Sequence, residues 1–329
     1  MKKIDQIFNN PKKAYIIAEI GSNFNQSLET GFKLIDVAKN SGADAVKFQM
    51  FKADTLYPKD KKMNSIFKSI ELQKNMAMKF FNYSFKKKID FFGSSFDEES
   101  FLFLEKIGSV AHKVASSETT NLSLLKEFSK SKKPIIISTG MCDIADIYEA
   151  VEVCKINNQK IVLLHTSSLY PTNHKDVNIS AISTLEKIFN LPVGFSDHTL
   201  DDLSAVMSIS YGAKVIEKHI TLDKNSKGPD HFYASDPDEF SKYVKSIRLA
   251  EKIIGNSEIK MHKDLYEFAR RDSIHIKKNV KKNEMITLDK IEIKRPATGI
   301  LSRYLNAVLG KTFNIDIKKG NSLKWHQIK

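Results

Sequence analysis

The sequence predicts a (β/α)₈ TIM barrel, an α/β fold, followed by a small β-rich domain. Three observations support this prediction. Short apolar runs alternate with segments of helical periodicity eight times between residues 14 and 254, which is the pattern of a parallel barrel. Polar and charged side chains gather where the apolar runs end. After Gly255 the alternation stops, and a basic stretch with short β-like segments follows.

The barrel elements follow in order from spacing and turn signals. Short apolar runs bounded by turns are typical of buried strands, and they predict strands at residues 14–21, 45–49, 90–96, 111–118, 134–140, 160–168, 192–198 and 213–220. Segments of helical spacing predict helices at residues 28–41, 73–87, 97–107, 122–131, 143–157, 180–189, 202–211 and 237–254. Asp97 is a suitable N-cap for its helix. Residues 50–72, which include Pro58 and several lysines, are expected to form a long insertion.

The chain is long enough for one large domain and one small domain. We expect the barrel at residues 1–255, a polar linker at 256–269, and a β-rich domain at 270–329 with strands at 273–276, 291–294 and 312–315. Residues 280–286 and 317–323 form a weak repeat. Asn283 and Gly320 are equivalent in it, and both residue types tolerate a left-handed turn conformation. A core of about 60 residues is marginal alone, so this domain is expected to dock on a partner surface.

The composition is that of a soluble globular protein, with 41% hydrophobic and 28% charged residues. No apolar run approaches the ~18 residues of a membrane helix, and the first residues lack the apolar region of a signal peptide. Cys142 and Cys154, the only cysteines, suit neither a zinc knuckle nor a disulfide framework. We therefore expect a cytoplasmic protein without a membrane partner.

Positive charge is concentrated near the C-terminus. The net charge is +13, and residues 270–329 contain 15 Lys+Arg against 5 Asp+Glu. A basic tail could bind nucleic acid, but this one lacks interleaved aromatic residues and the spacing of a helix-turn-helix or zinc motif. A solvated basic surface and a basic lid over an anionic substrate are the alternatives. We expect no nucleic-acid partner, and a non-catalytic binding protein with a basic tail is the competing hypothesis.

Two histidines at the ends of neighbouring strands are the best candidates for metal ligands. His198 and His219 are 21 positions apart, and active sites of such barrels lie at the carboxyl ends of the strands. Neutral imidazole suits manganese, zinc or iron. The alternative is that one or both are hydrogen-bonded structural histidines. Glu19, Glu118 and Glu217 could hold metal-bound water or act as acid or base, or could instead pair with nearby lysines.

Lysines and serines at other strand ends indicate an anionic substrate. Lys47 and Lys113 lie on separate strands, and a lysine is a strong point charge for phosphate or carboxylate. Several hydroxyl groups accompany them, namely Ser94, Ser116, Ser138 and Ser196. The combination predicts a phosphorylated, carboxylated small substrate. The alternative is that both lysines form internal salt bridges with the glutamates. Asp230, after the turn at Gly228, could reach a polyol hydroxyl.

These residues lie in segments that resemble the sialic acid (N-acetylneuraminate) synthase family. The segments are AEIG at 18–21, VKFQ at 46–49, HKVASSE at 112–118, STGM at 138–141, HTSSLYP at 165–171, FSDHT at 195–199, EKH at 217–219 and GPD at 228–230. The tail resembles the SAF (antifreeze-like) domain of this family through RPATGI at 295–300. The resemblance covers nearly the whole chain, and its motifs fall in order at the predicted strand ends.

The resemblance implies that the protein condenses phosphoenolpyruvate with N-acetylmannosamine and releases phosphate. It implies a divalent metal at His198 and His219, usually Mn²⁺, with Mg²⁺ or Co²⁺ possible. It gives catalytic roles to Glu19, Glu217 and Lys113. The implied substrate-binding residues are Lys47, Gln49, Ser94, Ser116, Glu118, Ser138, Tyr170, Ser196, Asp230 and Arg295.

The resemblance also implies a domain-exchanged homodimer, in which Arg295 reaches the sugar bound by the partner subunit. Legionaminate and pseudaminate synthases share these motifs, so a diacetamido-dideoxy sugar is an alternative substrate. The chain departs from the family pattern at three places. Residues 23–26 read NFNQ where the family has Asn-His-x-Gly, Ser94 and Ser95 replace Thr-Pro, and Ala297 replaces a common Gly.

Overall fold

The computed structural model describes residues 3–9, 12–158, 160–260 and 271–329. The chain divides into two compact units, Met1–Gly255 and Asn256–Lys329. Residues 261–269 of the predicted linker lie outside the described residues. None of the described helices is both long enough and apolar enough to cross a membrane.

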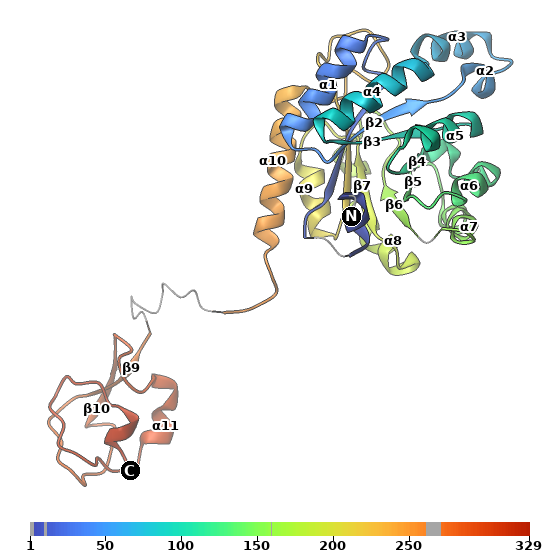
Figure 1. The fold of residues 1–329 in the computed structure, drawn as a ribbon. Helices are drawn as coiled ribbons and strands as arrows, with labels where there is room; N and C mark the ends of the chain where they lie inside the picture. Colours follow the sequence, from blue (N-terminus) through green and yellow to red (C-terminus); the bar gives the residue numbers. More distant parts are fainter. Residues whose placement is uncertain (1–2, 10–11, 159, 261–270) are drawn as a thin grey trace. The chain divides into compact units, whose positions relative to one another are not determined.

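Eight parallel strands close into a barrel, so the predicted fold is confirmed (Figure 1). Each strand pairs with the next along the chain, and β8 pairs with β1. The strands are β1 (Tyr15–Gly21), β2 (Ala45–Met50), β3 (Asp90–Ser95), β4 (His112–Val114), β5 (Ile135–Ser138), β6 (Ile161–His165), β7 (Val193–Asp197) and β8 (Val215–His219). The fourth strand is shorter than expected, because Ser116–Glu118 forms a 3₁₀ turn, η2, closed by the Glu118 amide on Ala115.

A ring of helices surrounds these strands (Figure 1). They are α1 (Leu28–Ser41), α4 (Lys74–Lys87), α5 (Glu98–Ile107), α6 (Leu122–Ser129), α7 (Ile144–Lys155), α8 (Ala181–Phe189), α9 (Leu203–Ser210) and α10 (Pro237–Ile254). Side-chain caps begin several of them. Asp97 accepts from the Ser100 amide at 2.7 Å, as its N-cap position predicts.

The insertion after β2 contains two helices that were not anticipated, α2 (Ala53–Leu56) and α3 (Lys61–Ile70). Asp60 caps α3 by accepting from the amides of Lys62 and Met63. A signal was present in the sequence, because apolar residues recur at helical spacing from Met63 to Ile70. The helix buries none of its residues, so it depends on its caps and neighbours more than on a core.

Apolar side chains fill the amino-terminal end of the barrel interior. This cluster includes Tyr15, Ile17 and Val215 from the strands, and Ile4 and Ile7 from the short 3₁₀ helix η1 (Lys3–Asn9). A larger apolar cluster lies between the strands and the helices. Because the amino-terminal end is filled with hydrophobic groups, polar side chains gather at the carboxyl ends of the strands.

Strand register sets which polar side chains become neighbours. Glu19 on β1 is level with Lys47 on β2 and with His219 on β8. Ser196 on β7 is level with Glu217 on β8. The register of β1 against β2 shifts between Glu19 and Gly21, so the regular alternation of side chains is interrupted beside Glu19.

The second unit has its own small core, which contains ten buried apolar residues among those that the structure describes. Strands β9 (Ser273–Ile276) and β10 (Ile291–Lys294) pair antiparallel, with the bounds expected from the sequence. Its other elements are η5 (Ser302–Tyr304), α11 (Leu305–Val308) and η6 (Trp325–Gln327). The predicted strand at 312–315 is wrong, since this segment makes only isolated bridges. Asn283 and Gly320 both have positive φ, of 69° and 88°, as their places in the repeat suggest.

Candidate active site

One cavity of about 370 Å³ opens at the carboxyl ends of the barrel strands. It brings together all the predicted site residues of the barrel except Glu118. The predicted residues that line it are Glu19, Lys47, Gln49, Ser94, Lys113, Ser116, Ser138, Tyr170, Ser196, His198, Glu217, His219 and Asp230. These side chains come from every strand of the barrel or from the loop that follows it.

Lys47 is held between two buried carboxylates. Its ammonium lies 2.7 Å from Glu19 Oε2 and 3.5 Å from Glu217 Oε1, and it donates to Ser94 Oγ at 2.9 Å. Gln49 donates to the other Glu19 oxygen at 3.0 Å. For Lys47, therefore, the structure shows the internal salt bridges that were the alternative to substrate binding.

The two carboxyl groups are pushed toward different protonation states. Burial raises the pKa of Glu19 to about 7, although Lys47 opposes the shift. Burial also acts to raise the pKa of Glu217, but Lys47 and Lys113 outweigh it, and this pKa is lowered. Pairs of titratable groups with pKa values pushed apart are typical of acid–base sites. Glu19 can thus exchange a proton near neutral pH while Glu217 remains ionised.

Lys113 has a different environment from Lys47. Its ammonium donates to Ser138 Oγ at 2.6 Å and to the Val114 carbonyl at 2.8 Å. Burial lowers its pKa to about 8. Since these partners are neutral oxygens, its positive charge remains available to an anion. Ser116 Oγ, nearby on the turn after β4, accepts from the Gly140 amide at 3.1 Å.

The two histidines have the properties of metal ligands. His198 donates from Nδ1 to the Ser167 carbonyl at 2.8 Å, which leaves its Nε2 lone pair for another partner. Burial lowers the pKa of His198 to about 4 and that of His219 well below its usual value, so both imidazoles are neutral. The ring centroids are 5.6 Å apart.

A buried ring nitrogen of His219 also fits a metal ligand. His219 Nδ1 is buried without a hydrogen-bond partner in the described part of the chain, and Asp230 Oδ2 is 3.7 Å away. No cluster of three or more His, Cys, Asp or Glu side chains suited to a metal occurs among the described residues. Two imidazoles on one metal would leave coordination positions for water and substrate, as catalytic metal centres do.

Aromatic side chains form one wall of the cavity, and several were missed at the sequence level. The Tyr170 ring is 4.2 Å from His198, and the Tyr233 ring is 5.1 Å from both Tyr170 and His219. Phe67, Phe96, Met141 and Tyr233 also line the cavity. Phe67 could have been found from the helical spacing in the insertion. Tyr233 follows Asp230 by three residues but has no motif of its own.

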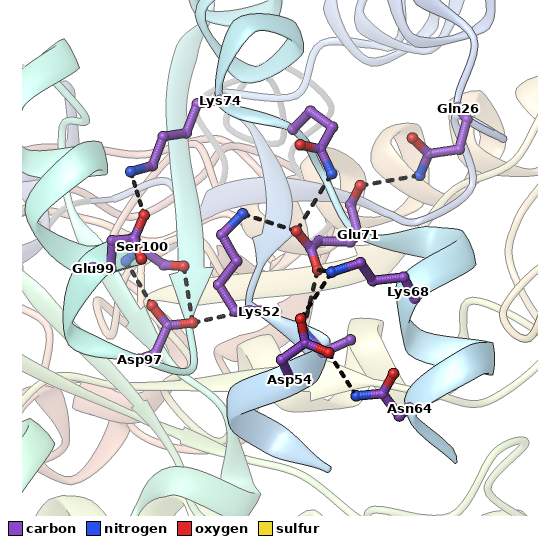
Figure 2. A network of polar contacts seen from close by, with 12 residues as sticks. Gln26, Lys52, Asp54, Asn64, Lys68, Glu71, Lys74, Asp97, Glu99 and Ser100 are labelled. Carbon is purple, nitrogen blue, oxygen red and sulfur yellow. Dashed lines mark hydrogen bonds and ion pairs between the residues drawn. The ribbon is translucent and has the colours of Figure 1, made fainter. Parts of the chain in front are cut away.

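Phe67 is presented to the cavity by α3, which a polar network anchors (Figure 2). The carboxylate of Glu71 lies at the centre of this network, and the Glu71 residue is 2% exposed. This group accepts from Lys52 Nζ at 2.8 Å and from the Ala53 amide at 3.1 Å. The Glu71 carbonyl accepts from Gln26 Nε2 at 3.3 Å. The network therefore joins the insertion to the loop after β1.

That loop contains the departure from the family pattern noted in the sequence. Phe24 is fully buried and packs against Phe48 and Phe80, with ring centroids 6.0 and 5.5 Å apart. Asn25 and Gln26 have positive φ values of 49° and 54°. Gln26 thus occupies a left-handed position where the family has a glycine, and its side chain is used for the contact with Glu71.

Two predicted site residues lie elsewhere. Glu118 accepts from Asn121 Nδ2 at 3.1 Å and does not line the cavity. Arg295 belongs to the second unit, where its side chain is 69% exposed and donates to Asp272 at 3.2 Å. Its predicted contact with a partner's sugar stays a prediction.

Comparisons with known proteins find matches to both units of the chain. The chain matches the NeuB family over residues 34–259 and the SAF domain over residues 271–329. It is 37% identical to N,N'-diacetyllegionaminic acid synthase of Legionella pneumophila, over 95% of this chain and 94% of the relative. It is 34% identical to pseudaminic acid synthase of Campylobacter jejuni, over 96% and 97%. The crystal structure of N-acetylneuraminic acid synthetase from Leptospira borgpetersenii superposes with a TM-score of 0.75 at 32% identity, covering 79% of this chain and 90% of that one.

Proposed function

We propose, from the premise that this chain belongs to the NeuB family, that it joins phosphoenolpyruvate to an N-acetylated sugar of the mannosamine type and releases phosphate. It is an enzyme of the carbon–carbon bond-forming transferase class. The observation that carries the proposal is the convergence of Lys113, the Glu19–Lys47–Glu217 cluster and the histidine pair on one cavity. Each group matches a different requirement of this reaction.

The lysines and serines suit phosphoenolpyruvate. Lys113 offers an ammonium group that forms no ion pair with a carboxylate of the described residues, and Ser138 supports it. Lys47 can exchange its contact with Glu217, at 3.5 Å, for a substrate oxygen. Charge-assisted hydrogen bonds of this kind are about twice as strong as neutral ones. Additional donors around them are Ser94, Ser116 and Ser196.

The chemistry requires a bond from C3 of phosphoenolpyruvate to the aldehyde carbon of the open-chain sugar, and the attack of water on C2. Glu19, with its pKa near 7, is suited to orient that water and accept its proton. The aldehyde oxygen takes up a proton as the carbon–carbon bond forms. The phosphate group then leaves with the electrons of the bond between C2 and the phosphate oxygen, and the new C2 hydroxyl loses its proton and becomes the keto group. Lys113 stabilises the charge that develops on the phosphate and carboxylate oxygens, and Glu217 holds the ammonium of Lys47 in place.

We propose that His198 and His219 hold the divalent metal, with Mn²⁺ the first choice and Mg²⁺ or Co²⁺ the alternatives. When bound, the metal supplies Lewis-acid polarisation of the sugar carbonyl. Sugar hydroxyl groups are assigned to Gln49, Tyr170 and Asp230, whose polar groups line the same cavity.

Two acceptor sugars compete within this proposal. N-acetylmannosamine is the acceptor expected from the sequence, and the likeness to a solved N-acetylneuraminic acid synthetase supports it. A diacetamido-dideoxy sugar is supported by the likeness to the legionaminic and pseudaminic acid synthases. The test is phosphate release from phosphoenolpyruvate with each sugar and Mn²⁺, and Lys113→Ala as the inactive control. Release with neither sugar would refute the synthase assignment.

We further propose a domain-exchanged homodimer acting in the cytoplasm. The Arg295 guanidinium is exposed and pairs with Asp272, which supports a role in contacting a ligand bound by another subunit. Both cysteines are free thiols, which supports the reducing cytoplasm as the location. Mixing the inactive variants Arg295→Ala and His198→Ala should restore activity if each subunit completes the other's site. Mixtures that stay inactive after subunit exchange, or a monomer by light scattering, would contradict the arrangement.

A further inference from the structure

The loop that carries Asp230 is tied down at both ends. It runs from Thr221 to Ser235, between β8 and α10. The Ser235 amide donates to the His219 carbonyl, and the Thr221 amide donates to the Ser235 carbonyl, both at 2.9 Å. Because the ends are fixed at the end of β8, the place of Asp230 depends on what holds the middle of the loop.

His231 holds that middle. Its side chain is 2% exposed, and Nε2 lies 3.0 Å from Asn25 Oδ1. Since an amide oxygen only accepts, Nε2 carries the proton and donates. Nδ1 then accepts from the Thr221 hydroxyl at 2.7 Å. One imidazole therefore joins the loop after β1, through Asn25, to the end of β8.

The fit around this imidazole is close. Gly228 has a φ of +154°, and a Cβ placed on it would lie 2.7 Å from His231 Cδ2. The ring thus packs directly on the backbone at Gly228, where a side chain would displace it. Asn25 supports the ring from a left-handed conformation, which Asn tolerates better than most residues.

Asp230 is next to His231 in the chain, so this anchor restrains its backbone, while the Tyr233 side chain is a hydrogen-bond partner of its carboxylate. Its Oδ2 lies 3.3 Å from the Cβ position of Gly21, where Glu19 Oε1 and Gln49 Nε2 also converge at 3.3 and 3.4 Å. This carboxylate accordingly faces both the proposed sugar contacts and the buried carboxylate on β1. A small movement of the loop would withdraw it.

We propose that His231, held by Asn25 and Thr221, is a positioning residue for the acceptor sugar, because it fixes Asp230 in the cavity. This inference rests on the proposed function. It assigns selectivity for the sugar in part to the loop after β1, where this chain carries Asn25 in a segment that departs from the family pattern. Phosphoenolpyruvate binding, assigned to Lys47, Lys113 and the serines rather than to Asp230, should not depend on it.

The test compares variants that break or keep the Asn25–His231 contact. His231→Ala and Asn25→Gly remove it, and glycine does so without backbone strain at positive φ. Asn25→Asp keeps an acceptor oxygen and tolerates the same conformation. Asn225→Ala, an exposed site on the same loop, is the matched control. We expect the first two to raise KM for the sugar about tenfold, as loss of an orienting contact would, with KM for phosphoenolpyruvate unchanged.

Amide hydrogen exchange gives a readout that does not need activity. Exchange over residues 226–235 should quicken in His231→Ala and Asn25→Gly, and stay as in the wild type in Asn25→Asp and Asn225→Ala. Unchanged exchange in the first two would overturn the positioning role. An equal rise in both KM values would overturn the link to the sugar. If none of the acetamido sugars makes the wild-type protein release phosphate from phosphoenolpyruvate, the proposed function and the sugar link are both refuted. The exchange data would still decide whether His231 anchors the loop.

Discussion

Replacing Lys47 with methionine is the most informative single change, because it separates the structural role of this residue from its role in binding. Methionine keeps much of the side-chain volume and removes the charge. Glu19, which is fully buried, and Glu217, which is 5% exposed, would then face each other without the ammonium that lies 2.7 and 3.5 Å from them. Lys47→Met should therefore destabilise the barrel as well as abolish activity.

The size of the loss follows from the cost of a buried charge without a partner. Removal of one member of a buried ion pair typically costs about 3–5 kcal/mol. At roughly 2–4 °C per kcal/mol for a domain of this size, the unfolding midpoint should fall by about 6–20 °C. The double variant Lys47→Met with Glu19→Gln should recover much of this loss, because one of the two charges is gone.

The loss should depend on pH. The pKa of Glu19 is raised from 4.5 to about 7 in the folded protein, so this carboxyl binds its proton more tightly folded than unfolded. Its contribution to stability is therefore greatest below pH about 4.5 and declines as the pH rises toward 7. Lys47 opposes that decline, so its removal should cost more at pH 8 than at pH 5.

Thermal unfolding followed by circular dichroism at pH 5 and pH 8 measures both effects. The reasoning fails if Lys47→Met unfolds at the wild-type temperature at pH 8, or if Glu19→Gln brings no recovery in the double variant. An equal loss at both pH values would show that Glu19 is not the group that Lys47 compensates.

Three further predictions concern the metal, the substrate anion and the barrel wall. Chelation should abolish phosphate release, and added Mn²⁺ should restore it. The His198→Ala variant should bind Mn²⁺ more weakly than the wild type, as measured by calorimetry. Full activity in the presence of chelator would contradict the metal assignment. Burial lowers the pKa of Lys113 to about 8, so this residue loses its charge as the pH rises through that value. We expect kcat/KM for phosphoenolpyruvate to fall over the same pH range. A kcat/KM that stays constant up to pH 9.5 would contradict the role of Lys113. Gly194→Ala would place a Cβ 2.4 Å from the Val215 carbonyl oxygen of the neighbouring strand. This clash should lower the free energy of unfolding, measured in urea, by ~1–3 kcal/mol. An unchanged unfolding midpoint would mean that β7 and β8 can separate locally.

The sequence predicted the barrel because its signal is repeated eight times, and a single ambiguous run could not hide it. It also predicted the two strands of the second unit with their observed bounds. The strand at 312–315 was wrong because an apolar run of that length does not reveal whether a partner strand lies alongside. The helix α3 was overlooked because lysines and Pro58 dominate the insertion, although its Asp60 cap and apolar spacing were visible.

For the site, motifs identified the side chains at strand ends but not the contacts between them. Nothing in the spacing of Lys47 and Lys113 distinguishes the lysine that is paired with carboxylates from the one that contacts only neutral oxygens. That difference depends on barrel register and on neighbours up to 170 positions apart. Glu118 looked like the other strand-end glutamates, yet the 3₁₀ turn after β4 directs it to Asn121. Tyr233 is a functional candidate only because the loop after β8 brings it to the cavity, and His231 only because the same loop brings it against Asn25.

The cluster of Glu19, Lys47, Glu217 and Lys113 has a consequence for which anions can enter. With protein groups alone, two acidic and two basic side chains nearly cancel, so the cavity is not a well of positive potential. Any anion that binds the Lys47 ammonium must first displace one of the two carboxylates that contact it. A monoanion can contact one lysine at a time, whereas a ligand with a phosphate and a carboxylate can contact Lys47 and Lys113 together and so better offset the ion pairs it breaks. The internal ion pairs thus act as a threshold for anion binding at Lys47, whereas Lys113, with its neutral partners, stays open to an anion.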